Sequence, residues 1–224
     1  MTDAKVQVAG SAAVTADDMS SINADGGGVG ITLATGVNVA AGISVALNRV
    51  AAGASAIIQN STVTANNDVT ITGTSAASIK SLTIGAAVAS SLNGSDNVAG
   101  LSFNLAGAGA GASNEVNNTA EAMIIGGKVL SNSGRVTLAA QDNSVIHADG
   151  GALAVELSLL NKGKLSANVS LGAAAAVNSV VNLTRTAILS GPSGTVAVVT
   201  ANGTVGDVSV TANSNARIDS LTIA

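Results

Sequence analysis

The sequence predicts an all-β protein, specifically a right-handed parallel β-helix (β-solenoid) that forms an elongated rod. Three observations support this: a near absence of aromatic residues, segments that repeat in register, and apolar residues that alternate with short polar ones. The 224 residues are 47% hydrophobic, yet they include one Phe and neither Trp nor Tyr. Globular cores usually obtain much of their buried area from aromatic side chains, so a repetitive fold built from small aliphatic residues is favoured.

The balance of hydrophobicity and charge excludes a disordered chain. Mean hydropathy is +0.49, and the formal net charge is only −4. Disordered segments show the opposite combination, low hydrophobicity with high net charge. The Val, Ile and Leu residues must therefore be hidden in structure, since otherwise they would cause aggregation.

Four segments repeat in register along the chain. They read AAVTADDMSSI (12–22), VTITGTSAASI (69–79), VTLAAQDNSVI (136–146) and VSVTANSNARI (208–218), and successive copies lie 57, 67 and 72 residues apart. We predict one unit, residues 1–224, built of imperfect repeats at 12–68, 69–135 and 136–207 with a partial repeat at 208–224. The predicted core stack is Ile22, Ile79, Ile146 and Ile218, with Val14, Ile71, Leu138 and Val210 beside them.

A second set of segments lies between the first. It reads LNRVAAGASAII (47–58), SNEVNNTAEAMI (113–124) and NSVVNLTRTAIL (178–189). Two interleaved sets with the same order indicate that one supersecondary unit has been duplicated.

The repeats alternate apolar and short polar residues with a period of two, which is typical of strands with one buried and one exposed face. Asn-Asn, Asn-Gly, Asp-Gly-Gly and Ser-Gly pairs between them are turn formers, and the single proline, Pro192, leaves strand N–H groups free to bond. Coils of about 20 to 25 residues would give about ten coils and a rod on the order of 50 Å long.

Three stretches, 30–47, 98–113 and 167–183, are long, apolar and uncharged. Membrane helices are the alternative, because about 20 apolar residues span a bilayer. The alternation continues through all three stretches, which favours strands. Their Ala and Gly runs would allow a sheet to lie very close to another surface.

Three segments, AVNSVVNLTRTAILSG (176–191), NEVNNTAEAMIIGG (114–127) and LNRVAAGASAIIQNS (47–61), together with DVTITGTSAASIKSLTIGAAV (68–88), carry a family resemblance. The chain resembles the repetitive body of filamentous haemagglutinin-like and leukotoxin-like large bacterial exoproteins. That resemblance covers essentially the whole chain and implies coils of a right-handed parallel β-helix exported by an autotransporter or two-partner route. It also implies an extracellular or cell-surface location.

Composition excludes several kinds of site. The chain has no cysteine, so it has neither disulfides nor thiolate metal ligands. Nine Lys and Arg residues spread singly, with a pI near 4.7, argue against a nucleic-acid partner. The start, residues 1–5, lacks the regions of a signal peptide, so we expect part of a longer protein.

We predict no catalytic, cofactor-binding or metal-binding residue, and no enzyme. His147 lies near Asp142 and Asp149, but the other repeats carry Asn23, Lys80 and Asp219 in its place, as at a solvent-facing position. The two ADGG segments, 24–27 and 148–151, have one Asp each and are interpreted as capped tight turns rather than calcium sites. The 13 acidic residues are scattered, unlike those of polysaccharide-cleaving β-helices.

The function expected is structural, as the shaft or rigid spacer of a secreted or cell-surface bacterial adhesin. One alternative is a self-assembling extracellular fibre or biofilm matrix component, and another is a membrane-active toxin fragment. The partners expected are a host surface or a second copy of the chain in a homo-oligomer or fibre. A membrane partner is not favoured, because the apolar stretches alternate.

Overall fold

The computed structural model describes residues 1–34, 36–91, 101–158, 165–192, 194–204 and 206–224. These residues form sixteen β-strands and no helix, and every strand pair is parallel. The prediction of an all-β fold with parallel strands is therefore confirmed. No helix within the described ranges is long and apolar enough to cross a bilayer.

The strands form four sheets, and each sheet pairs strands from successive repeats of the chain. The first contains β1 (Lys5–Val8), β5 (Thr62–Ala65), β9 (Lys128–Ser131) and β14 (Val198–Ala201). The second contains β2 (Ala12–Asp18), β6 (Val69–Ser75), β10 (Val136–Asp142) and β15 (Val208–Ser214). The third contains β3 (Ser21–Ala34), β7 (Ser78–Ser91), β11 (Val145–Ser158) and β16 (Arg217–Ile223). The fourth contains β4 (Val37–Gln59), β8 (Leu101–Ile125), β12 (Leu165–Val180) and β13 (Leu183–Leu189).

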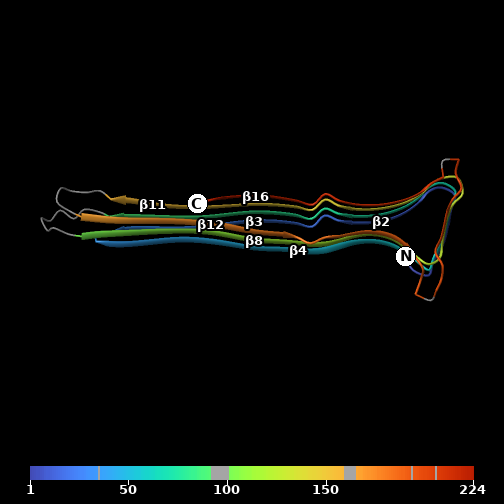
Figure 1. The fold of residues 1–224 in the computed structure, drawn as a ribbon, viewed down its shortest axis with the longest axis horizontal. Helices are drawn as coiled ribbons and strands as arrows, with labels where there is room; N and C mark the ends of the chain where they lie inside the picture. Colours follow the sequence, from blue (N-terminus) through green and yellow to red (C-terminus); the bar gives the residue numbers. More distant parts are fainter. Residues whose placement is uncertain (35, 92–100, 159–164, 193, 205) are drawn as a thin grey trace.

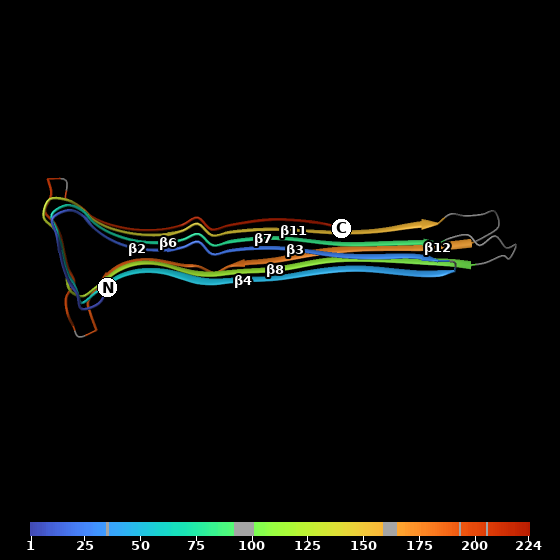
Figure 2. The same cartoon turned by 180° about the vertical axis from the view of Figure 1, so that it is seen from behind.

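The chain passes through the four sheets in the same order each time, and we call one such passage a circuit. A circuit crosses a short end wall (β1), runs outward along one long side (β2 and β3), and returns along the other (β4) (Figure 1). Seen from behind, the long sides of successive circuits again lie side by side (Figure 2). Each circuit is therefore a long, flattened loop. The circuits are stacked on one another through hydrogen bonds between parallel strands.

The prediction of about ten coils of 20 to 25 residues is wrong. Residues paired across adjacent circuits lie 57 to 72 positions apart, so each repeat forms only one circuit. The long dimension follows the strands: the 23 residues of β4 span about 75 Å, whereas four stacked strands span only about 15 Å. The short-coil estimate failed because the two Asp-Gly-Gly segments and the pair Asn117-Asn118, which it interpreted as turns, lie inside long strands.

Residues opposite each other on neighbouring strands form rows across the stack. One row contains Ile22, Ile79, Ile146 and Ile218, and another contains Val14, Ile71, Leu138 and Val210. The members of these two rows that belong to the two middle circuits are fully buried, whereas Ile218 and Val210 in the last circuit are each 44% exposed. The third segment of the second set is one residue out of register, because Ile124 pairs with Ile188 rather than Leu189.

The interior becomes narrower from the wall outward. Near the wall it contains large side chains such as Ile58, Ile71 and Leu138. The middle cluster combines Ile79 and Ile146 with alanines. The outermost cluster consists of buried alanines only, namely Ala40, Ala87, Ala89, Ala106, Ala108 and Ala152. The size of the inward side chains therefore sets the separation of the two long sides.

We call the outer part of each circuit the distal arm, comprising the described residues of 26–47, 83–113 and 150–177. At several inward glycines of this arm the facing backbone leaves no room for a side chain: a β-carbon placed on Gly28 would lie 2.0 Å from the carbonyl oxygen of Ile43. At Gly42 the corresponding distance, to the carbonyl oxygen of Ala86, is 1.8 Å. Backbone contact between the sides thus explains why glycine occupies these strand positions.

Two predictions about these strands are wrong for the same reason. The ADGG segments do not form turns, because Asp25 and Asp149 lie inside β3 and β11. In the distal arm the large apolar residues of the alternating pattern face outward, whereas the pattern predicts that they face the interior. Thr32 points inward while Ile31 and Leu33 are 72% and 59% exposed, since only the smaller residue fits between the sides.

Candidate functional site

His147 lies on the outer surface and is separated from Asp142. It shares a row with Asn23, Lys80 and Asp219, and its Nε2 lies 3.2 Å from Asp149 Oδ2. The His147 side chain is 52% exposed, whereas Asp142 is buried. The described residues contain no group of three His, Cys, Asp or Glu side chains placed to hold a metal ion.

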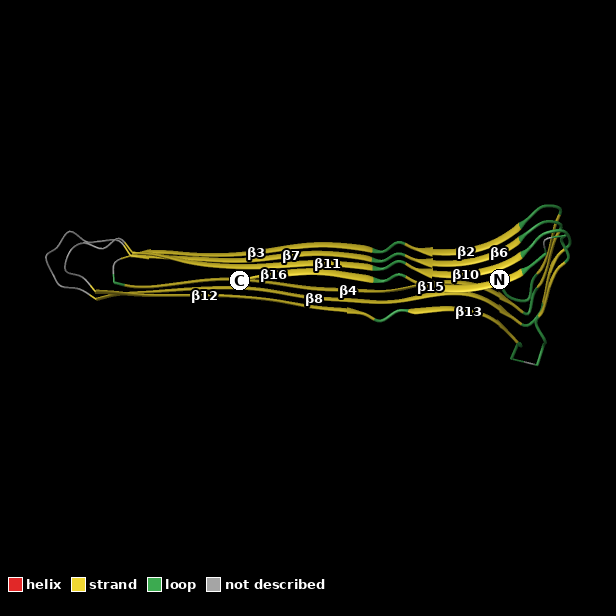
Figure 3. Cartoon of the chain, turned by 45° about the horizontal axis from the view of Figure 1, so that its top comes forward, coloured by secondary structure: helices red, strands yellow, loops and turns green. Residues whose placement is uncertain are grey.

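Asp142 is the centre of a polar cluster inside the stack. Its carboxylate accepts hydrogen bonds from Ser144 Oγ at 2.5 Å, Asn182 Nδ2 at 2.7 Å and Ser214 Oγ at 2.9 Å. In the neighbouring circuit Asn118 Nδ2 donates to Ser75 Oγ at 2.9 Å. The cluster lies where short loops interrupt the outward strands at the same level in successive circuits (Figure 3). It connects the two long sides at a point where the strands are broken.

Asparagine side chains form ladders along the stack. Asn38 Nδ2 donates to Asn104 Oδ1 at 2.8 Å, and Asn104 Nδ2 donates to Asn168 Oδ1 at 2.8 Å. A second ladder runs from Asn48 through Asn114 to Asn178 with the same distances and direction. The central amides, Asn104 and Asn114, each donate to one neighbouring circuit and accept from the other, so these rows fix the register between circuits.

We expect replacement of Asn104 by Ala to destabilise the fold by about 2 to 3 kcal/mol, because a fully buried amide loses its partners in both adjacent circuits. Urea unfolding of the whole chain measures this. Asn117→Ala is the matched control, since Asn117 is an exposed residue of the same strand, and its effect should stay within about 0.5 kcal/mol. Equal effects from the two variants would contradict a structural role for the ladder.

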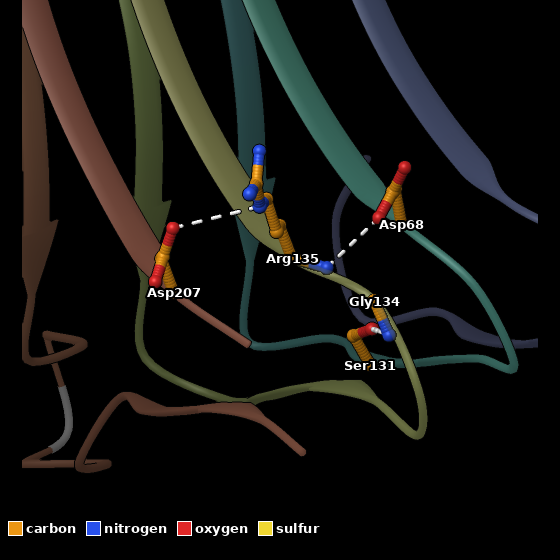
Figure 4. Close-up of polar contacts among 5 residues, drawn as sticks. All are labelled: Asp68, Ser131, Gly134, Arg135 and Asp207. Atoms are coloured by element: carbon orange, nitrogen blue, oxygen red, sulfur yellow. Dashed lines mark hydrogen bonds and ion pairs between the residues drawn. The ribbon is translucent and has the colours of Figure 1, made fainter. Parts of the chain in front are cut away.

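The corner before the second sheet is also connected across circuits. Arg135 N donates to Asp68 Oδ1 at 2.8 Å, and Arg135 Nε lies 3.5 Å from Asp207 Oδ2 (Figure 4). Gly134 N donates to Ser131 Oγ at 2.9 Å within the same loop. The three charged residues come from three successive circuits, and the ion-paired side chains of Arg135 and Asp207 are 54% and 63% exposed. Their arrangement indicates a register contact rather than a reactive site.

The distal arm instead presents two apolar outer faces. The outbound face consists of outward side chains of β3, β7 and β11, and its large exposed members are Val29, Ile31, Leu33, Ile84, Leu153, Val155 and Leu157. The return face consists of positions 37, 39, 41, 43, 45 and 47 of β4 with their row partners on β8 and β12. Its large exposed members are Val37, Val39, Ile43, Val45, Leu47, Phe103, Val169, Leu171 and Val177.

Charged side chains border the two faces. Asp25, Lys80 and Asp149 lie beside the outbound face, and Arg49 with Glu115 lies beside the return face. Within the described part of the distal arm the one charged residue is Glu156, which points inward and accepts a hydrogen bond from Ala106 N at 3.0 Å. Exposed apolar patches of this extent mark interaction surfaces, so these faces are the candidate functional site.

The three apolar stretches identified in the sequence contain the return face and part of the outbound face, but the alternation alone did not show that their large residues lie on the outer surface. One feature of the sequence indicates this outward position. In residues 37–47 the odd-numbered positions carry the large aliphatic residues, while the even-numbered positions carry only small or short polar residues. Five neighbouring small inward residues cannot fill an ordinary sheet-to-sheet gap of about 10 Å. Comparison of the chain with known protein families, with curated proteins and with solved structures finds no match.

Proposed function

We propose that the chain is a segment of a right-handed parallel β-solenoid that acts as the shaft or rigid spacer of a secreted or cell-surface bacterial adhesin. The right-handed sense follows from the preferred hand of crossovers between parallel strands. The extracellular setting rests on the resemblance of the repeats to filamentous haemagglutinin-like exoproteins. A structural role fits a molecule whose polar contacts run mainly between equivalent positions of successive circuits.

The observation that carries the proposal is the repetition of rows across the stack. The asparagine ladders use one donor direction and one separation in each step, so a further circuit could continue them unchanged. Next to the last circuit a pocket of about 430 Å³ is lined by Val180, Asn182, Ser214, Ala216 and Ile218. Another circuit placed there would bury the exposed row members Ile218 and Val210.

Inserting one extra circuit tests the proposal. A second copy of residues 69–135, placed after Arg135, begins and ends at row positions that are already paired, Val69 with Val136. We expect the longer chain to fold with a higher Tm, because each added repeat contributes one more interface of the same kind. Small-angle X-ray scattering should show the stack thickened by about 4.8 Å with an unchanged long dimension.

The control contains the same residues in a permuted order, 102–135 followed by 69–101. This insert has identical length and composition, but its strands cannot enter the rows in register, so the Tm should fall and the extra thickness should be absent. If both inserts give the same Tm and the same thickness, circuit stacking is not the basis of the structure and the shaft proposal fails.

A further inference from the structure

The return face exposes more apolar surface than an isolated soluble chain normally does. Its nine large side chains are between 40% and 77% exposed. At roughly 100 Å² for each side chain, they present on the order of 900 Å² of apolar surface. The largest patch on a typical monomer is about 300 to 600 Å², while a stable interface covers about 800 Å² on each partner. The six of these side chains that lie on β4 and β8 account for about 600 Å², which is at the upper limit for a monomer and approaches the area that one partner contributes to a stable interface.

The relief of this face is self-complementary. On the central strand β8 the outward residues Gly107, Gly109 and Gly111 form a trough, since a β-carbon at Gly107 or Gly111 would meet no atom within 4 Å. On the adjacent edge strand, Ile43 and Val45 form a ridge beside it. Each ridge residue lies in the same row as a trough glycine, Ile43 with Gly109 and Val45 with Gly111.

We propose that the return face binds the return face of a second copy of this chain. A two-fold axis parallel to the strands, midway between β4 and β8, places the ridge of each copy over the trough of the other. Ile43 of one copy then covers Gly109 of the other copy, and the reverse contact forms by symmetry. The contact is a packing of aligned sheets, and the same surface serves both partners. It concerns the outer face, so it does not depend on circuits being added to the stack.

A second copy suits this face better than lipid does. Strands β3 and β4 are edges of their sheets, so in hydrocarbon their outer N–H and C=O groups would lack partners at several kcal/mol each. In a lateral pair the same edges remain in water. The chain also contains no Trp or Tyr, the residues that normally hold strands at the two membrane interfaces.

Gly109→Leu tests the proposal, because it should weaken binding of a second copy of the chain but strengthen binding of lipid. The new side chain points outward, where the nearest atom to its β-carbon is Ile43 Cγ1 at 3.9 Å, so folding should be retained. It fills the trough and excludes the ridge of a second copy, and sedimentation velocity should show the association constant reduced at least about tenfold. The same change makes the face more apolar, so binding to lipid would increase.

Asn117→Leu is the matched control, because it adds the same side chain on the same strand outside the return face. We expect Asn117→Leu to associate like the parent chain. A parent chain that remains monomeric at every concentration, or Gly109→Leu that associates as strongly as the parent, overturns the proposal. So does binding to phosphatidylcholine and phosphatidylglycerol vesicles that increases in Gly109→Leu, since lipid is then the occupant.

Cross-linking tests the orientation of the pair. The chain lacks cysteine, so Ile43→Cys and Gly109→Cys each introduce a single thiol. With a short bifunctional maleimide, an equimolar mixture of the two variants should give more cross-linked dimer than either variant alone, because the ridge position lies over the trough position of the other copy. Cross-linking of Ile43→Cys alone that equals the mixture would place ridge on ridge and contradict the proposed axis.

Discussion

Gly85→Val should prevent stable folding. A β-carbon at Gly85 would lie 2.1 Å from the carbonyl oxygen of Gly109 on the opposite side of the distal arm. The obstructing atoms belong to the backbone of a central strand, so relief requires the two long sides to separate. We expect a loss of at least about 3 kcal/mol, a large part of the 5 to 15 kcal/mol that stabilises a typical domain. Thermal unfolding followed by far-UV circular dichroism measures the loss.

Gly151→Val is the control for this prediction. Gly151 lies on the neighbouring strand β11 in the same sheet, but its β-carbon would point outward with no atom within 4 Å. Its row partner in the adjacent circuit is Ile84, so the row already contains a β-branched residue. The Tm of Gly151→Val should equal or exceed that of the parent. A similar decrease in both variants would show that the glycines matter through backbone flexibility rather than through contact between the sides.

The register could be predicted from the sequence because it depends on matching side chains at fixed offsets. The segments ending at Ile22, Ile79, Ile146 and Ile218 align by inspection, and these residues are row partners in the structure. The segment placed at 178–189 slipped by one residue because Ile188 and Leu189 are both apolar. In a strand a slip of one residue exchanges inward and outward faces.

The length of a circuit and the sidedness of the arm could not be predicted in the same way. Alternation shows which residues share a face, but the inner face depends on the distance to the opposite side, and that distance is a property of the whole circuit. Gly28 and Gly30 are turn formers in isolation, and in the structure they lie within β3 opposite Ile43 and Ala41. The outward position of Ile43 and Leu47, and with it the candidate interaction surface, follows from this contact.

Ile146→Asp should abolish cooperative unfolding. Ile146 is fully buried in the middle cluster with Ile79 and Val116, and its row has a member in every circuit of the stack. A carboxylate at this position would have lost its hydration without gaining a partner in that apolar cluster, which costs several kcal/mol. Because both adjacent circuits pack against this residue, the damage should extend through the stack. A urea titration should show a broad, shallow change in place of a sharp transition.

His147→Ala, one residue further along the same strand, should leave the transition almost unchanged. The imidazole is half exposed and its contact with Asp149 lies at the surface, where such contacts contribute less than about 1 kcal/mol. The two adjacent substitutions thus compare an inward-facing position of β11 with an outward-facing one. Equally mild effects would mean that Ile146 does not face a packed interior, and rows of apolar side chains would then not be what holds the circuits together.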